Sequence, residues 1–203
     1  MIELYTAKTP NGRKVSVMLE ELGVAYRAIP VDLGKGEQFS PDFLALNPNN
    51  KIPVIRDLDN GQVIFESGAI LIYLAEKAGQ LLAPAGAPER VAQLEWLFFQ
   101  MASIGPMMGQ LFHFRNYQGE PEPHALDRFS GEVERIFRVL ETRLSTVPYL
   151  GGADYSIADI ASYPWVKLGG FLGVDLETLP GVSTWLALVG ARPAVQRGIE
   201  VPG

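Results

Sequence analysis

The chain of 203 residues contains no cysteine. A protein without thiols cannot form disulfides, hold a metal ion through thiolates, or use a thiol of its own as a nucleophile. The sequence contains only two histidines, His113 and His124, which argues against a histidine metal cluster or a serine–histidine–aspartate triad. We therefore expect no metal site, and any nucleophile would have to arrive with a ligand.

Long apolar runs and an excess of positive charge are also missing. No stretch of about 18 apolar residues occurs, which predicts that no segment spans a membrane. The N-terminus, Met-Ile-Glu-Leu-Tyr, lacks the basic region and apolar core of a signal peptide. The formal charge of −6 argues against binding to nucleic acid, which needs a basic face. We expect a globular protein of the cytoplasm with neither a nucleic acid nor a membrane as partner.

The first 80 residues carry both strand and helix patterns. Residues 2–6 alternate as in a strand, and residues 12–22 repeat apolar side chains at helical spacing up to Gly23. A strand at 28–33 follows. The dipeptide Asn60-Gly61 predicts a tight hairpin between two short apolar runs, before a helix with Ser67 as its N-cap. This order, a β-α-β unit followed by a hairpin and a helix, is thioredoxin-like.

The second part of the chain lacks strand signals. Prolines and a glycine between residues 80 and 88 break the periodicity and predict a linker. Helical patterns then cover 91–104, with a kink or break at Gly105-Pro106, and 125–144. Ser156 and Asp159 have the spacing of a capping box. We predict an α/β domain at 1–80, a linker at 81–87 and an all-helical domain at 88–203.

The stretch from Asn47 to Ala69 has two features that suit the α-amino-acid end of a small peptide. Ile52 precedes Pro53 and is pushed towards an extended conformation, so its backbone could pair with an extended ligand. A helix that starts near Ser67 presents free N–H groups to a carboxylate, and Glu66 could take an ammonium group. Spacing alone favours the alternative, an ordinary capped helix after a turn proline.

The segment Asn-Pro-x-x-Lys-Ile-Pro-x-Ile, followed by Glu-Ser-x-Ala-Ile-x-x-Tyr-Leu, resembles the glutathione-binding half of cytosolic glutathione transferases. The resemblance implies their architecture, a thioredoxin-like domain followed by an all-α domain. It implies that the bond before Pro53 is cis and that the Ile52 backbone pairs with the cysteinyl part of glutathione. It also implies that Glu66 and Ser67 hold the γ-glutamyl end.

Further positions also match the family. Gln38 and Lys51 correspond to positions near the glycyl carboxylate, with a solvated loop residue and a surface charge as the alternatives. Arg128 corresponds to a cation near bound glutathione. Residues 112–115 and Tyr117 form a mostly aromatic stripe in the region from which the family builds its second substrate site, although such a stripe is more often core.

The residue that meets the glutathione sulfur should lie just after the first strand. A donor or a helix N-terminus aimed at a thiol lowers its pKa from about 8.5. Thr9 and Asn11 lie in this region, whereas Tyr5 lies inside the strand, where a packing role is expected. Thr-Pro-Asn-Gly resembles the bacterial Nu class, also called disulfide-bond oxidoreductase-type transferases, and implies that Thr9 and Asn11 are catalytic.

The Nu-class resemblance implies an enzyme that reduces small disulfides with glutathione as thiol donor, with weak conjugation of electrophiles or peroxidase activity beside it. The absence of cysteine is consistent with this activity, since two glutathione molecules would supply both thiols. It also implies a homodimer. The alternative is a non-catalytic transferase-like module that carries a ligand or docks to a partner.

Overall fold

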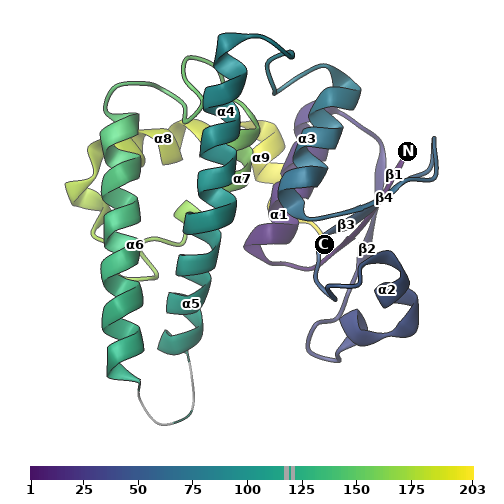
Figure 1. Cartoon of the computed structure of the whole chain (residues 1–203), viewed down its shortest axis with the longest axis horizontal. Coiled ribbons are helices and arrows are strands. Elements are labelled where there is room, and N and C mark those ends of the chain that lie inside the picture. Colours follow the sequence, from purple (N-terminus) through teal and green to yellow (C-terminus); the bar gives the residue numbers. More distant parts are fainter. Residues whose placement is uncertain (117–118, 120–121) are drawn as a thin grey trace. The chain divides into compact units, whose positions relative to one another are not determined.

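The computed structural model of the chain describes residues 1–116, 119 and 122–203. Its residues form two compact units, one made of Met1–Pro84 together with Gly190–Gly203 and the other of Ala85–Val189 (Figure 1). The predicted domain ranges of 1–80, 81–87 and 88–203 stay a prediction. Residues 190–203 pack with the first unit, although no sequence pattern indicated this.

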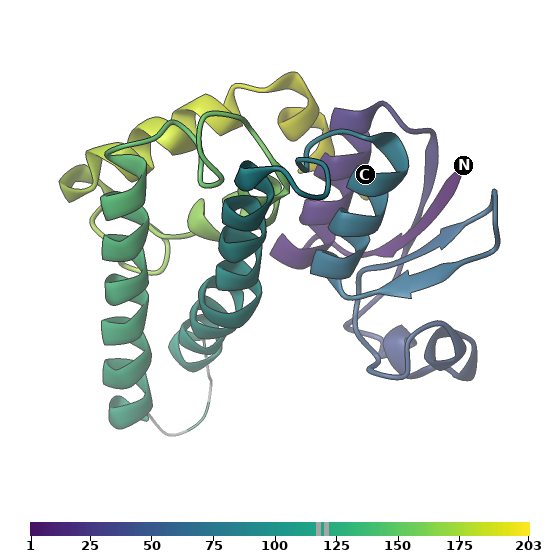
Figure 2. The same ribbon diagram turned by 45° about the horizontal axis from the view of Figure 1, so that its top comes forward.

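The first unit is built on a four-stranded sheet with the strand order β2-β1-β3-β4. Strands β1 and β2 are parallel, and the other two pairs are antiparallel. Helices α1 and α3 lie side by side on one side of the sheet and α2 on the other (Figures 1 and 2). The predicted thioredoxin-like order is confirmed. The elements are β1 (Ile2–Thr6), α1 (Pro10–Leu22), β2 (Tyr26–Pro30), η1 (Glu37–Phe39), α2 (Pro41–Leu46), β3 (Val54–Asp57), β4 (Val63–Phe65) and α3 (Ser67–Ala78).

Strand β1 is covered on both faces. Side chains alternate along a strand, so Ile2, Leu4 and Thr6, all almost fully buried, share one face. Tyr5 points to the other face and packs against a small core that contains Phe43 of α2. Tyr5 therefore lies on the opposite face of β1 from Ile2, Leu4 and Thr6.

Three boundaries predicted for the first unit differ from the structure. The second strand is β2 at Tyr26–Pro30 and not 28–33, because it pairs in register with β1 and ends at a proline, which has no N–H to donate. Helix α1 begins at Pro10, two residues before the predicted start, because Thr9 caps it. The N-cap of α3 is Glu66 and not Ser67, which is the first residue of the helix.

The last residues of the chain complete the first unit. Helix α9 (Pro193–Gly198) packs along α1. The contact is close at Gly198, where an added Cβ would lie 2.5 Å from the Cα of Val17. The Ser16 hydroxyl donates to the Gly198 carbonyl over 2.6 Å, and the guanidinium of Arg192 forms a two-bond ion pair with Glu21. Only glycine allows the two backbones to approach this closely.

The second unit is helical. It contains α4 (Pro88–Phe99), the π-helical turn η2 (Gln100–Ile104), α5 (Gly105–Arg115), α6 (Pro123–Leu144), α7 (Ile157–Val166), η3 (Leu176–Thr178) and α8 (Pro180–Gly190). The kink or break predicted at Gly105-Pro106 takes the form of this π turn, after which the helix continues into α5 (Figure 1). Among the described helices, none is long and apolar enough to cross a membrane.

The predicted capping box at the start of α7 is confirmed. The Asp159 carboxylate accepts the backbone N–H of Ser156 over 3.0 Å, and the Ser156 hydroxyl caps the helix in return. The same carboxylate accepts the backbone N–H of Leu150 over 2.9 Å and the indole N–H of Trp185 over 2.8 Å. One buried carboxylate thus joins α7, the preceding loop and α8, which agrees with a role in folding.

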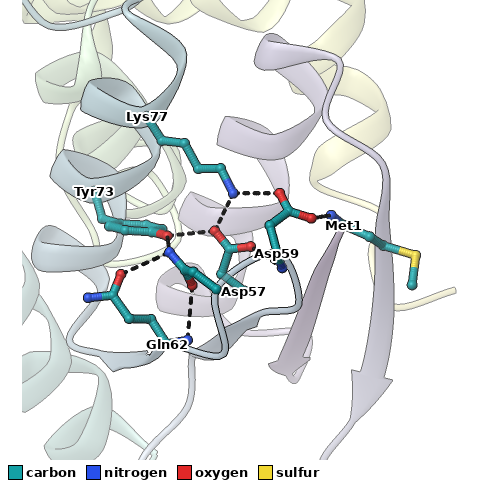
Figure 3. A network of polar contacts seen from close by, with 7 residues as sticks. Met1, Asp57, Asp59, Gln62, Tyr73 and Lys77 are labelled. Atoms are coloured by element: carbon teal, nitrogen blue, oxygen red, sulfur yellow. Dashed lines mark hydrogen bonds and ion pairs between the residues drawn. The ribbon is translucent and has the colours of Figure 1, made fainter.

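The hairpin of β3 and β4 is fastened to α3 by the network drawn in Figure 3. Asp57 on β3 is fully buried and accepts hydrogen bonds from Tyr73 and Lys77 of α3. Burial opposes ionisation of Asp57, but the hydrogen bonds outweigh it and its pKa lies below the ordinary value. Lys77 and the amino group of Met1 also bind Asp59, which lowers the pKa of Asp59 to about 2.

We predict that Lys77→Met lowers the free energy of unfolding by about 2–4 kcal/mol, because it leaves a buried carboxylate without its cation. The matched control is Lys35→Met, which removes an exposed ion pair with Asp32 and should cost less than about 1 kcal/mol. In the wild type, the contribution of Asp57 should be present above about pH 4 and be lost as the pH falls further, because its folded pKa is depressed. Urea unfolding at several pH values measures both effects, and equal losses in the two variants would contradict the prediction.

Candidate functional site

Six of the residues predicted for glutathione binding or catalysis line one cavity of about 70 Å³ in the first unit. They come from the start of α1, the loop before β3 and the start of α3, which are distant in sequence. The lining residues are Asn11, Asn47, Lys51, Ile52, Pro53, Glu66 and Ser67. Asn47 is the one member that the sequence analysis did not select.

The loop before β3 contributes Lys51, Ile52 and Pro53 to the lining of this cavity. The Ile52–Pro53 peptide bond is cis, as the family resemblance implied. Ile52 precedes the first paired residue of β3, Val54, so it is not part of the sheet ladder. Its side chain packs instead against the core of Val31, Phe43 and Val54. The Ile52 side chain thus anchors the loop, and both Ile52 and Pro53 line the cavity.

Asn47 holds this loop in shape. Its side chain is 2% exposed, and its amide nitrogen donates to the Lys51 carbonyl over 2.7 Å while its amide oxygen accepts from the Asn49 backbone over 2.9 Å. An asparagine before a proline is a typical turn residue, and this turn signal could have identified Asn47 as a supporting residue.

The corner between β4 and α3 carries the two polar groups of the site. Glu66, the N-cap, has φ 71° and ψ 113°, a conformation that is rare for a residue with a side chain. Such strained residues gather at functional sites, where the surrounding structure holds them. The corner turns the exposed Glu66 side chain and the buried Ser67 side chain towards the same cavity. An acidic group and a helix N-terminus therefore lie next to each other.

A buried cation lies beneath this corner. Lys14 of α1 is 2% exposed, and its Nζ donates to the Ser67 hydroxyl over 3.3 Å. Burial lowers the pKa of Lys14 to about 7, although the charge of Glu66 opposes the change. The sequence analysis overlooked Lys14, but it stands four residues before Met18 on the apolar stripe of the helix. A lysine on a buried stripe is itself a signal.

The start of α1 is held tightly against the end of β1. The Thr9 hydroxyl oxygen accepts the Gly12 N–H over 3.2 Å and so caps the helix. A Cβ added to Gly12 would lie 2.4 Å from the Ala7 carbonyl oxygen, so only glycine fits this approach. A hydroxyl that accepts one hydrogen bond keeps a proton to donate, so Thr9 can serve as cap and as donor. Thr9 precedes the cavity-lining Asn11 by two residues but does not line the cavity.

Tyr5 faces a different cavity on the α2 side of the sheet, with a volume of about 310 Å³ and with Phe43, Leu46 and Arg56 in its lining. Its hydroxyl donates to Glu3 over 3.3 Å, and burial raises its pKa above the ordinary value. The packing role expected for Tyr5 agrees with this position.

The remaining predicted residues lie elsewhere. Gln38 is on η1, and its buried amide oxygen has no hydrogen-bond partner in the described part of the chain. Arg128 is an exposed residue of α6 in the second unit. In that unit, Arg115, Asn116 and Phe171 line part of a cavity of about 500 Å³, whereas Tyr117 falls outside the described residues. Within the described ranges, no cluster of histidine and carboxylate side chains could hold a metal ion.

Comparison with known proteins gives matches over most of the chain. Family models match the glutathione S-transferase N-terminal domain at residues 9–77 and the C-terminal domain at residues 93–193. The chain is 48% identical over 204 residues to the disulfide-bond oxidoreductase YfcG of Escherichia coli (strain K12), covering 98% of this chain and 94% of the relative.

Two solved structures are similar over the whole of this chain and most of their own length. A glutathione transferase homologue from Lodderomyces elongisporus, with two glutathiones per subunit, has a TM-score of 0.95 and 39% identity, with 100% of this chain and 99% of the other covered. A glutathione transferase from Pseudomonas putida, with one glutathione disulfide bound per subunit, has a TM-score of 0.90 and 43% identity, with 100% and 92% covered.

The sequence matches and the fold agree with the resemblance and with the predicted architecture. Strands β2, β3 and β4 of the sheet, the cis proline and the acidic corner before α3 all lie within the part that matches the N-terminal family model. The chain belongs to the glutathione S-transferase family.

Proposed function

We propose that this protein is a glutathione-dependent enzyme that reduces small disulfides. The observation that carries the proposal is the meeting of Asn11, Ile52, Glu66 and Ser67 in one cavity beside the capped start of α1. These groups suit the backbone, the ammonium and the carboxylate of a γ-glutamyl peptide. The relative named a disulfide-bond oxidoreductase and the homologue with bound glutathione disulfide support the same chemistry.

In the proposed reaction the protein supplies no thiol. The thiolate of one glutathione attacks a sulfur of the substrate disulfide, a new S–S bond forms and one thiolate leaves. A second glutathione attacks the mixed disulfide, so that glutathione disulfide and a second thiol are released and two electrons have passed to the substrate. The chain contributes groups that favour the thiolate: the Thr9 hydroxyl, the Asn11 amide and the N-terminus of α1.

Several roles extend this proposal. Lys51 and Gln38 would bind the glycyl carboxylate, and Arg128 would supply a further cation for glutathione. As the resemblance implies, residues 112–115 would contribute to the site for the disulfide or electrophile. Weak conjugating or peroxidase activity would follow from the same activated thiolate, since it attacks carbon and oxygen electrophiles as well as sulfur.

A non-catalytic ligand-binding or partner-docking module is the alternative. Binding of the chain to immobilised glutathione without any turnover of small disulfides would favour this alternative. A coupled assay with a small disulfide, run beside conjugation of an electrophilic nitroarene, separates the two functions.

We predict that Ser67→Ala and Glu66→Ala each weaken glutathione binding about ten- to a hundred-fold, because each removes a hydrogen bond to a charged group. The fold should be little affected, since Glu66 is exposed and alanine is a good helix former at position 67. Calorimetric dissociation constants measure the effect, with the exposed Glu89→Ala on α4 as control. Unchanged constants in both site variants would remove the proposed γ-glutamyl subsite.

We predict that Thr9→Ala and Asn11→Ala each reduce disulfide-reductase turnover, since removing one aligned donor from a thiolate costs about 1–3 kcal/mol. Thr9→Ser keeps both the cap and the donor and should retain most of the activity. Tyr5→Phe should be nearly silent, because Tyr5 faces the other side of the sheet. Loss of activity in Tyr5→Phe with a silent Thr9→Ala would make this a tyrosine-type transferase.

We also propose that the protein is a cytoplasmic homodimer, as the resemblance implies. Sedimentation velocity over a wide concentration range should give the mass of two chains. A monomer at every concentration would be inconsistent with this assembly.

A further inference from the structure

Lys14 is a charged residue at a buried position, where burial of its ammonium group destabilises the fold. Its side chain is among the largest that are fully buried, and it lies on the apolar stripe of α1. Removing an ammonium group from water is energetically unfavourable, and a methionine of similar length would avoid this penalty. Folding alone therefore gives no reason for a lysine at this position, which points to a role at the adjacent cavity.

The contacts of Lys14 lead to that cavity. Its Nζ lies 3.3 Å from the hydroxyl oxygen of Ser67, and an ammonium can only donate in this contact. The Ser67 oxygen is thereby an acceptor on the Lys14 side, so its proton is directed elsewhere. The N-terminus of α3 adds partial positive charge at the same place. The Lys14 ammonium and the start of α3 therefore place positive charge around the Ser67 hydroxyl, next to the carboxylate of Glu66.

We propose that Lys14 is a positioning residue that orients and polarises Ser67 towards the α-carboxylate of a bound γ-glutamyl group. The proposal rests on the function proposed above. Lys14 does not touch the ligand in this arrangement; it fixes the direction in which Ser67 donates and supplies the compensating charge from behind. With Glu66 facing the ammonium, the corner would select a zwitterionic α-amino-acid end over a simple acid or amine.

The state of the Lys14 ammonium depends on its neighbours. Within the first unit, α1 packs against β1, α3 and α9. The charged groups of α9, Arg192 and Arg197, are paired with Glu21 and Glu20 further along α1, and on α3 Lys77 is bound to Asp57. Glu76 lies near the end of α3, and Glu3 and Tyr5 of β1 point to the opposite face of the sheet. Among the described titratable groups, Glu66 is the one whose charge acts on Lys14.

A bound carboxylate would change this balance. Without ligand, the pKa of Lys14 is about 7, so at pH 8 the side chain is mostly neutral. A negative charge placed at Ser67 favours the charged form and raises that pKa. Binding of a γ-glutamyl ligand at pH 8 should therefore take up a proton, whereas a ligand without the α-carboxylate should not.

A thermodynamic cycle tests the proposal. Calorimetry at pH 6 compares wild type and Lys14→Met with two ligands: S-methylglutathione, and its analogue in which 4-aminobutyrate replaces the γ-glutamyl group and so lacks the α-carboxylate. We expect Lys14→Met to bind S-methylglutathione about ten-fold more weakly, the size of one charge-assisted hydrogen bond, and the analogue within about two-fold of wild type. An equal loss for both ligands indicates a merely structural role and overturns the proposal, as does no loss for either.

Proton uptake by the wild type gives a second measurement that does not depend on the variant folding. Binding enthalpies at pH 8 in two buffers of different ionisation enthalpy count the protons taken up. Uptake should persist with a glutaryl analogue, which keeps the carboxylate and lacks the amine, and should vanish with the 4-aminobutyryl analogue. Absence of uptake with S-methylglutathione overturns the role of Lys14. Absence of any binding of S-methylglutathione to the wild type overturns the proposed function as well.

Discussion

The hydrogen bonds from Tyr73 and Lys77 to the buried carboxylate of Asp57 fix α3 against the β3–β4 hairpin. The corner at Glu66 lies between these two elements, and its positive φ is held only while both ends are fixed. A strained corner in a free loop would relax to an ordinary turn. The polar network thus joins the two elements that flank the corner from which Glu66 and Ser67 line the cavity.

Backbone groups and short side chains supply most of the polar groups of the site. Helix starts at Pro10 and Ser67 supply partial charge, and the loop at Ile52 supplies a backbone edge outside the ladder. These groups do not titrate near neutral pH, so their contribution is constant. Lys14 is the exception, and it is placed behind Ser67 rather than in contact with solvent. Such an arrangement keeps the electrostatic field in place before any ligand arrives, which lowers the cost of reorganisation on binding.

The sequence predicted the fold well because its signals were local. Ser156 with Asp159 specified a helix start that is present, and Asn60-Gly61 correctly indicated a hairpin. The predicted tight two-residue turn was wrong, because the loop between β3 and β4 covers residues 58–62. The motif around Pro53 and Glu66 identified most of the cavity lining. Lys14 and Asn47 were missed for different reasons. The burial of Lys14 depends on a helix 53 residues away in sequence, and the role of Asn47 depends on the path of a loop that no periodicity describes.

The same limit explains the errors at element ends. Whether Glu66 or Ser67 caps α3 is decided by the backbone angle at the corner, which the hairpin imposes. Likewise, β2 ends at Pro30 because of its register with β1. Secondary-structure propensity alone cannot locate the end of a helix or strand to within one residue when tertiary contacts set that end.

The packing of α9 on α1 makes the first unit discontinuous in sequence. During synthesis the first 84 residues leave the ribosome long before residues 190–203 do. Until then the face of α1 around Val17 has no partner, and the Ser16 hydroxyl lacks its bond to Gly198. The α1 face that packs against α9 is therefore covered only after residues 85–189 have been translated, although most of the first unit comes earlier in the chain.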